Sequence, residues 1–136
     1  MIPCPGTRTE RGASLSVFVA TVVVALLAVA GLVIDGGAQA AAARECQLVA
    51  SEAARAASDA GALNRAAGLA VDPGAMRAAA SEVLATHPRV QGDVQVSGGQ
   101  VVVSTRATIS TTFLSLIRIT TLAASGHATV TLAPTG

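Results

Sequence analysis

Aromatic and charged side chains are scarce in this chain. The sequence has no Trp and no Tyr, and among its 136 residues aromatic side chains make up 1% and charged side chains 12%, against about 25% charged residues in ordinary globular proteins. There is no Lys, so all nine basic residues are Arg. Because the chain offers neither a basic patch nor aromatic side chains on which bases could stack, we exclude nucleic acid as a partner.

Patterns typical of catalysis and metal binding are also absent from the sequence. An active site needs several titratable groups that converge, yet His87 and His127 have no Cys, Asp or Glu at the spacing of metal ligands. No serine stands in a G-x-S-x-G context, and no Gly-rich phosphate loop occurs. We therefore expect a protein that is not an enzyme, with no cofactor, no metal and no small-molecule substrate.

The two cysteines, Cys4 and Cys46, lie on opposite sides of a long apolar segment. If that segment crosses a bilayer, the two thiols lie in different compartments and cannot pair within one chain. Unpaired cysteines are the main interpretation. A disulfide between two chains through Cys46 is the alternative.

One apolar run predicts a membrane span. Residues 12–34 contain no charged side chain, and about 20 helical residues cross a hydrocarbon core of about 30 Å. A single segment in hydrocarbon must satisfy its own backbone hydrogen bonds, which requires a helix. The sequence therefore predicts a short leader over residues 1–12 and a transmembrane helix over residues 13–34.

The charges that flank this run predict its orientation. Arg8 and Arg11 precede the run and Asp35 follows it; because basic residues stay on the cytoplasmic side, we expect the N-terminus inside and the C-terminal domain outside. A cleaved secretory signal, with Ala38-Gln39-Ala40 as the cleavage site, is the competing interpretation. The run is longer than the apolar core of about 7 to 15 residues that signal peptides have.

An Ala-rich stretch over residues 35–60 follows the span and predicts a helix. Ala is the best helix former, so we expect the membrane helix to continue outward, with a bend at Gly36-Gly37; a break at this glycine pair is the alternative, because glycine is costly inside a helix. A narrow apolar stripe at helical spacing would face the rest of the domain. Its members are Cys46, Val49, Ala53 and Ala56.

Residues 61–136 predict a small α+β domain. Residues 61–71 are expected to form a connector. A second helix follows, capped by Asp72, with Pro73 in its first turn and its end near His87 and Pro88. Core packing is the favoured role of its apolar side, which holds Met76, Ala79, Ala80, Val83 and Leu84.

The period of the apolar residues then changes to two, which is typical of strands. Strands are expected over residues 94–97, 101–109 and 122–132, and Gly98-Gly99 between the first two predicts a tight hairpin turn. Apolar residues would face inward and threonines outward in an antiparallel sheet of three strands. Residues 111–119 predict a short helix, capped by Thr111 or Thr112, that closes one edge or end of the sheet.

Residues 10–58 resemble the N-terminal signature of the TadE/TadG-like proteins, the minor pilin-like components of tight-adherence (Flp) pilus systems. The similar elements are Arg11-Gly12, the apolar run, and the exit Val33-Ile34-Asp35-Gly36-Gly37 with the Ala-rich helix after it. The segment 111–119 and the threonine-alternating last strand are also similar to these proteins. Together these matches cover about half of the chain.

The resemblance implies a structural or assembly role in the bacterial cytoplasmic membrane, with pilus or secretion proteins and other pilin-like subunits as partners. It also implies prepilin-type processing after Gly12, with Ala13 as the first mature residue. The fifth position after such a cut is Val17, where prepilins typically carry Glu, so both a processed subunit and an uncleaved membrane anchor stay open. A membrane-tethered binding or sensory module unrelated to pili is the alternative function.

Overall fold

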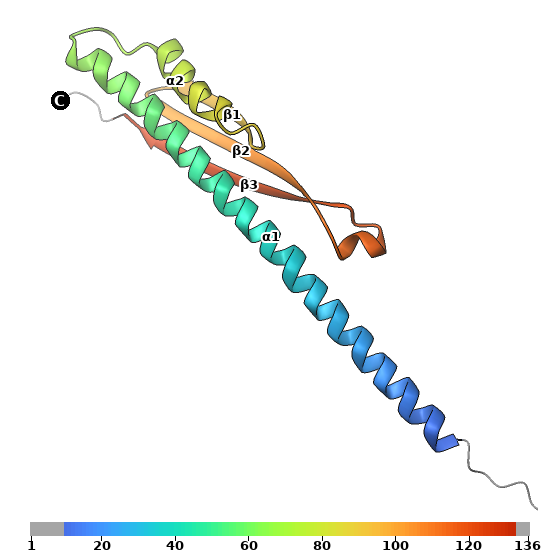
Figure 1. The fold of residues 1–136 in the computed structure, drawn as a ribbon. Helices are drawn as coiled ribbons and strands as arrows, with labels where there is room; N and C mark the ends of the chain where they lie inside the picture. The colour runs from blue at the N-terminus through green and yellow to red at the C-terminus, as the bar shows by residue number, and fades with distance from the viewer. Residues whose placement is uncertain (1–9, 133–136) are drawn as a thin grey trace, which may run out of the picture.

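The computed structural model describes residues 10–132, with side chains from Ser14 onward. The chain is an α+β protein, as the sequence predicts: a long N-terminal helix, a second helix, and a three-stranded antiparallel sheet with a short turn before the last strand (Figure 1). The elements are α1 (Glu10–Ala66), α2 (Pro73–Ala85), β1 (Gln91–Ser97), β2 (Gln100–Ser110), the 3₁₀ turn η1 (Leu114–Ile117) and β3 (Thr121–Thr131).

Helix α1 runs the length of the molecule without interruption. It has 57 residues, which at 1.5 Å per residue is about 85 Å. The helix continues through Gly36 and Gly37 (Figure 1), so the predicted outward continuation is confirmed and the alternative of a break there is wrong. Residues 61–66 are helical too, which corrects the predicted connector: Gly61 is packed against Met76 and Leu132, and this burial holds the last turns of the helix.

Helix α2 begins as the sequence predicts. The Asp72 carboxylate Oδ1 accepts a hydrogen bond from the Gly74 N–H at 2.8 Å, and Pro73 occupies the first turn, where its missing N–H is not needed. Met76 and Ala80 are fully buried against α1 and the sheet. The helix ends at Ala85, slightly before the predicted end.

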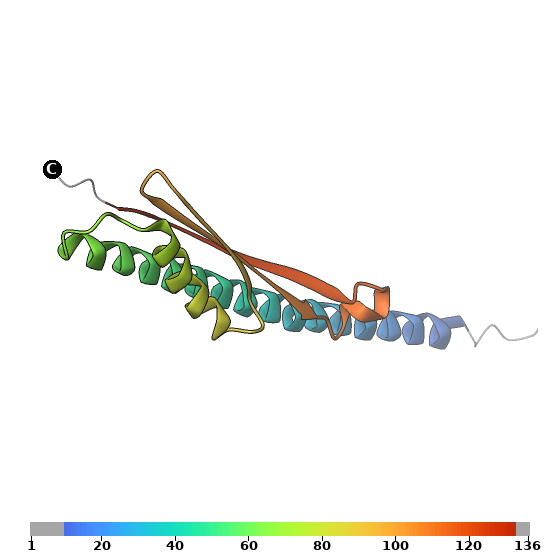
Figure 2. The same cartoon turned by 90° about the horizontal axis from the view of Figure 1, so that it is seen from above.

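The sheet has the order β1-β2-β3 with both neighbouring pairs antiparallel. Gly98 and Gly99 form the hairpin turn with φ of +56° and +75°, values that favour glycine, and Ser97 pairs with Gln100 across it. The three predicted strands are confirmed, with β1 starting earlier, at Gln91. One face of the sheet packs on the outer half of α1, and α2 lies beside α1 and β1 (Figures 1 and 2).

Helix and sheet approach each other closely at Gly126 of β3. A Cβ atom at this position would overlap the backbone of Cys46 and Gln47 in α1, so only glycine lets the strand pass so near. Thr105, the partner of Gly126 on β2, is buried and donates its hydroxyl to the Cys46 carbonyl oxygen at 2.8 Å. The sheet is therefore fixed to α1 by a backbone contact and a buried hydrogen bond at one crossing point.

Candidate functional site at the exit of the apolar helix

The inner half of α1 extends beyond the domain with its apolar side chains uncovered. Their exposed fractions range from 40% at Val22 to 68% at Val33. Among the described residues this is the one helix long and apolar enough to cross a membrane, with a mean hydropathy of 3.0 in its most apolar window. A water-soluble protein rarely leaves so large an apolar surface uncovered, so this half of α1 needs a lipid or protein environment.

Asp35 joins this apolar half to the sheet domain. Its carboxylate accepts hydrogen bonds from three consecutive backbone N–H groups in the segment that leads into η1, those of Thr112, Phe113 and Leu114, at 2.9, 2.9 and 2.7 Å. The side chain is only 3% exposed. The sequence predicts that Asp35 marks a membrane exit, which stays a prediction; the structure shows that Asp35 ties the β2–β3 connection to α1.

These hydrogen bonds replace the predicted cap of the short helix. Neither Thr111 nor Thr112 caps η1; the N-cap position is Phe113, which makes no side-chain capping bond. The segment is a single 3₁₀ turn, and Asp35 satisfies the N–H groups that open it, as a capping side chain would. The prediction of a local threonine cap was wrong because the acceptor lies on another element, 77 to 79 residues away in the sequence.

The same hydrogen bonds act on the charge of Asp35. The N–H groups of Leu114 and Thr112, with a smaller effect from Phe113, lower the pKa of its carboxyl below the ordinary value of 3.8, while burial acts in the opposite direction. Asp35 is therefore ionised at neutral pH. Its negative charge is held beside three N–H dipoles rather than left bare next to an apolar surface.

The turn before β3 packs against Gly31 of the apolar helix. A Cβ atom on Gly31 would overlap the Phe113 ring, so this ring lies directly against the α1 backbone. An apolar groove of about 550 Å³ continues from this contact between helix and turn. Its lining includes Val24, Leu27, Ala28, Leu114, Leu116 and Ile117.

The other predicted site residues do not gather at this junction. Gly36 and Gly37 lie within α1, and a Cβ atom on either would meet nothing within 4 Å. Gly12 and Ala13, the predicted processing site, belong to α1, where only the backbone is described, and Cys4 and Arg8 lie outside the described residues. Processing at Gly12 stays a prediction.

Two glutamines on α1 cover the outer edge of β3. The Gln47 amide donates to the His127 carbonyl oxygen at 2.8 Å and accepts from the His127 N–H at 3.1 Å, as a neighbouring strand would. Gln39 donates to the Ala123 carbonyl oxygen at 3.2 Å. Because an uncovered edge strand invites pairing with another chain, these side chains protect part of the sheet from aggregation. In the sequence, the two glutamines of an Ala-rich helix are the one feature that could have pointed to this contact.

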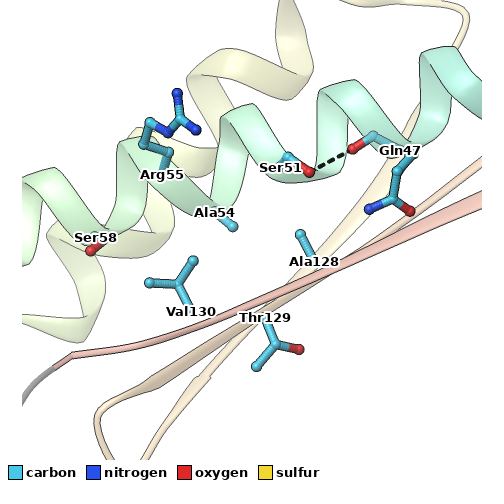
Figure 3. Close-up of a pocket in the computed structure, with 8 residues that line it drawn as sticks. All are labelled: Gln47, Ser51, Ala54, Arg55, Ser58, Ala128, Thr129 and Val130. Carbon is cyan, nitrogen blue, oxygen red and sulfur yellow. Dashed lines mark hydrogen bonds between the residues drawn. The ribbon is translucent and has the colours of Figure 1, made fainter.

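A groove of about 440 Å³ lies between α1 and β3, with Gln47 among the residues that line it (Figure 3). Ser51, Ala54 and Ser58 line its helix side, while Ala128, Thr129 and Val130 line the strand side. Arg55 is the charged side chain of the lining, and it points away from the strand in Figure 3. The lining brings together no pair of groups suited to acid–base or nucleophilic chemistry.

The remaining residues of chemical interest are separate from one another. Cys46 is fully buried, with its Sγ 3.8 Å from the Ala124 carbonyl oxygen, so a disulfide to another chain would require the core to open. His127 is exposed on the outer face of the sheet beside Ser104 and Thr129, and His87 contacts the Val83 carbonyl oxygen at the end of α2. Among the described residues, no three His, Cys, Asp or Glu side chains could hold one metal ion.

In comparisons with protein-family models, curated proteins and solved structures, no match to this chain was found.

Proposed function

We propose that this chain is a minor pilin-like or accessory membrane subunit of a tight-adherence (Flp) type pilus or a related secretion system. Its role is assembly, not catalysis. The single-pass helix lies in the bacterial cytoplasmic membrane, with the N-terminus inside and the domain outside. Its partners are other pilin-like subunits and the proteins that assemble them.

The observation that supports this proposal is the division of α1 into two halves within one unbroken helix. The outer half is part of the domain core, where Ala50, Ala53, Ala54 and Ala57 are fully buried. From Leu15 to Ile34 the large apolar side chains of the inner half are exposed, and the turn before β3 packs against this half at Gly31. A subunit built in this way presents a folded domain on an apolar rod, which packs in lipid before assembly and against other helices after it.

Cross-linking in the native host tests the assembly role. A cysteine is introduced at Leu26, which is 64% exposed on the apolar half, in a chain with Cys4 replaced by Ser. The matched control carries the cysteine at Leu63, which is 71% exposed at the far end of α1. We expect Leu26→Cys to give cross-linked species that contain pilin-like subunits. If both variants stay monomeric in cells that build the appendage, the proposal is wrong.

Mass spectrometry of the mature N-terminus, with protease treatment of spheroplasts, tests the topology. A chain that starts at Ala13 indicates prepilin-type processing, and an intact Met1 indicates an uncleaved anchor; either agrees with a membrane subunit. A start near residue 41 indicates signal cleavage and overturns the anchor. We expect a C-terminal tag to be digested in intact spheroplasts, and a protected tag would contradict the orientation.

A further inference from the structure

We propose that the turn between β2 and β3, residues 113–119, is a second membrane anchor: it inserts its apolar side chains among the acyl chains of the leaflet on the side of the domain. The proposal rests on α1 spanning a bilayer and does not require the chain to enter a filament.

The turn exposes large apolar side chains that no part of the domain covers. Leu116 is 82% exposed, Ile117 68% and Ile119 42%. These residues lie at the end of the sheet that faces the apolar half of α1 (Figures 1 and 2). Their surface is continuous with the uncovered side chains of the helix, because the apolar groove between the two is lined by both. An environment that surrounds the helix therefore reaches the turn as well.

The turn lies beside α1 at a level N-terminal to Ile34, the last residue of the apolar run. Phe113 contacts Gly31, and the groove extends down to Val24, whereas the uncharged run continues up to Ile34. At 1.5 Å per residue, Gly31 lies about 5 Å and Val24 about 15 Å below Ile34. Interfacial segments typically bury their apolar face by about 5 to 10 Å. A bilayer that covers residues 13–34 therefore covers the apolar side chains of the turn.

Non-helical backbone is costly in hydrocarbon unless its polar groups are paired. In this turn they are paired within the protein: Asp35 accepts from Thr112, Phe113 and Leu114. Further along, the N–H groups of Leu116, Arg118 and Ile119 donate to carbonyl oxygens of the same segment, and the Ser115 hydroxyl donates to the Thr112 carbonyl oxygen. The turn can therefore enter the interface without exposing many unpaired groups to lipid.

Arg118, the one charged residue of the turn, is also compatible with a place at the membrane interface. Arg118 adopts a left-handed conformation with φ of 68° and is exposed. A long arginine side chain can keep its apolar stem in the interface while its guanidinium reaches lipid phosphates. Asp35 is the sole acidic residue from Ser14 to Arg44, and its carboxylate is hydrogen-bonded to three backbone N–H groups rather than left unpaired at the edge of the apolar run.

The absence of Trp and Tyr from the sequence makes this proposal directly testable. A single Trp replaces Leu116 in the full chain, which is then reconstituted into phosphatidylcholine–phosphatidylglycerol vesicles. The matched control is Leu63→Trp, where the side chain is comparably exposed but lies at the opposite end of the domain. Lipids brominated near the headgroup or deep in the acyl chain serve as quenchers of the Trp emission.

We expect the emission of Leu116→Trp to be blue-shifted and to be quenched more strongly, by about twofold, by the shallow than by the deep bromines, as an interfacial depth requires. The emission of Leu63→Trp should be that of Trp in water and unaffected by either lipid. Two results would overturn the proposal. One is a Leu116→Trp emission that matches the control. The other is a blue-shifted but unquenched emission that is lost on dilution into excess lipid, which would show that a second copy of the chain covers the turn.

Discussion

Replacing Gly126 by Ala tests whether the crossing of β3 over α1 requires a bare backbone. The added methyl group would overlap the Cys46 and Gln47 backbone, and backbone atoms in the middle of a long helix cannot rotate away as a side chain can. We therefore expect β3 to move outward, which weakens the buried bond from Thr105 to the Cys46 carbonyl oxygen.

The size of the effect follows from three contributions to the free energy of unfolding. Overpacking a tight site costs about 1 to 3 kcal/mol, and the weakened hydrogen bond about 1 kcal/mol. The lower entropy of the unfolded chain with Ala in place of Gly offsets about 0.4 to 1 kcal/mol. The net expectation for Gly126→Ala is a loss of about 2 kcal/mol.

Hydrogen–deuterium exchange of the full chain in detergent micelles measures this loss, because exchange of peptides from residues 100–132 reports opening of the sheet separately from the micelle-embedded helix. Gly37→Ala is the matched control. It makes the same chemical change in α1, where an added Cβ atom would meet nothing within 4 Å. We expect this variant to raise the free energy of unfolding by about 0.5 to 1 kcal/mol. Equal protection of β3 in Gly126→Ala and in the unmodified chain would refute the packing argument.

Three further predictions concern the core, the junction and the sheet edge. Met76→Ala removes a fully buried side chain and should lower the free energy of unfolding by about 2 to 5 kcal/mol. Leu63→Ala, on the exposed side of α1, should change it by less than about 0.5 kcal/mol. Denaturant titration in micelles compares the two variants. Folding lowers the pKa of Asp35, so its stabilising contribution is complete above the ordinary value of 3.8 and is lost as the pH falls through the lowered pKa. The difference in free energy of unfolding between the unmodified chain and Asp35→Asn should therefore disappear on acidification. A difference that is independent of pH would contradict the role of the carboxylate. Gln47→Ala uncovers the edge of β3 at His127 and should increase concentration-dependent association measured by light scattering. Gln95→Ala on β1, where the amide donates a hydrogen bond to the Asp93 side chain of the same strand, should not.

The periodic parts of the fold were predictable from the sequence because each follows from local chemistry. The change from helical to alternating spacing predicted the three strands, Gly98-Gly99 predicted their hairpin, and Asp72-Pro73 predicted the start of α2. On β3, every second residue from Leu122 to Leu132 faces the helix, as the alternation indicated.

The parts that the sequence did not predict depend on contacts between distant segments. Asp35 serves as the cap of a turn far away in the sequence, and nothing in its neighbourhood indicates this partner. Gly31 and Gly126 resemble other glycines in the chain until the fold brings Phe113 to one and Cys46 to the other. Gly61 and Asn64 are weak helix formers, so the sequence predicts a connector over residues 61–71. In the structure, packing of Gly61 against Met76 and Leu132 outweighs that preference, and residues 61–66 are helical.

The unbroken course of α1 has a mechanical consequence. From Asp35 to Ala66 the helix extends about 47 Å beyond the apolar run, and the sheet is fixed to it at the Gly126 crossing, so the apolar half of α1 and the domain act as one rigid lever. A tilt of about 10° of the apolar half would carry the far end sideways by about 8 Å. A force on the apolar half would therefore move the far end of the domain, because α1 is one continuous helix from Glu10 to Ala66.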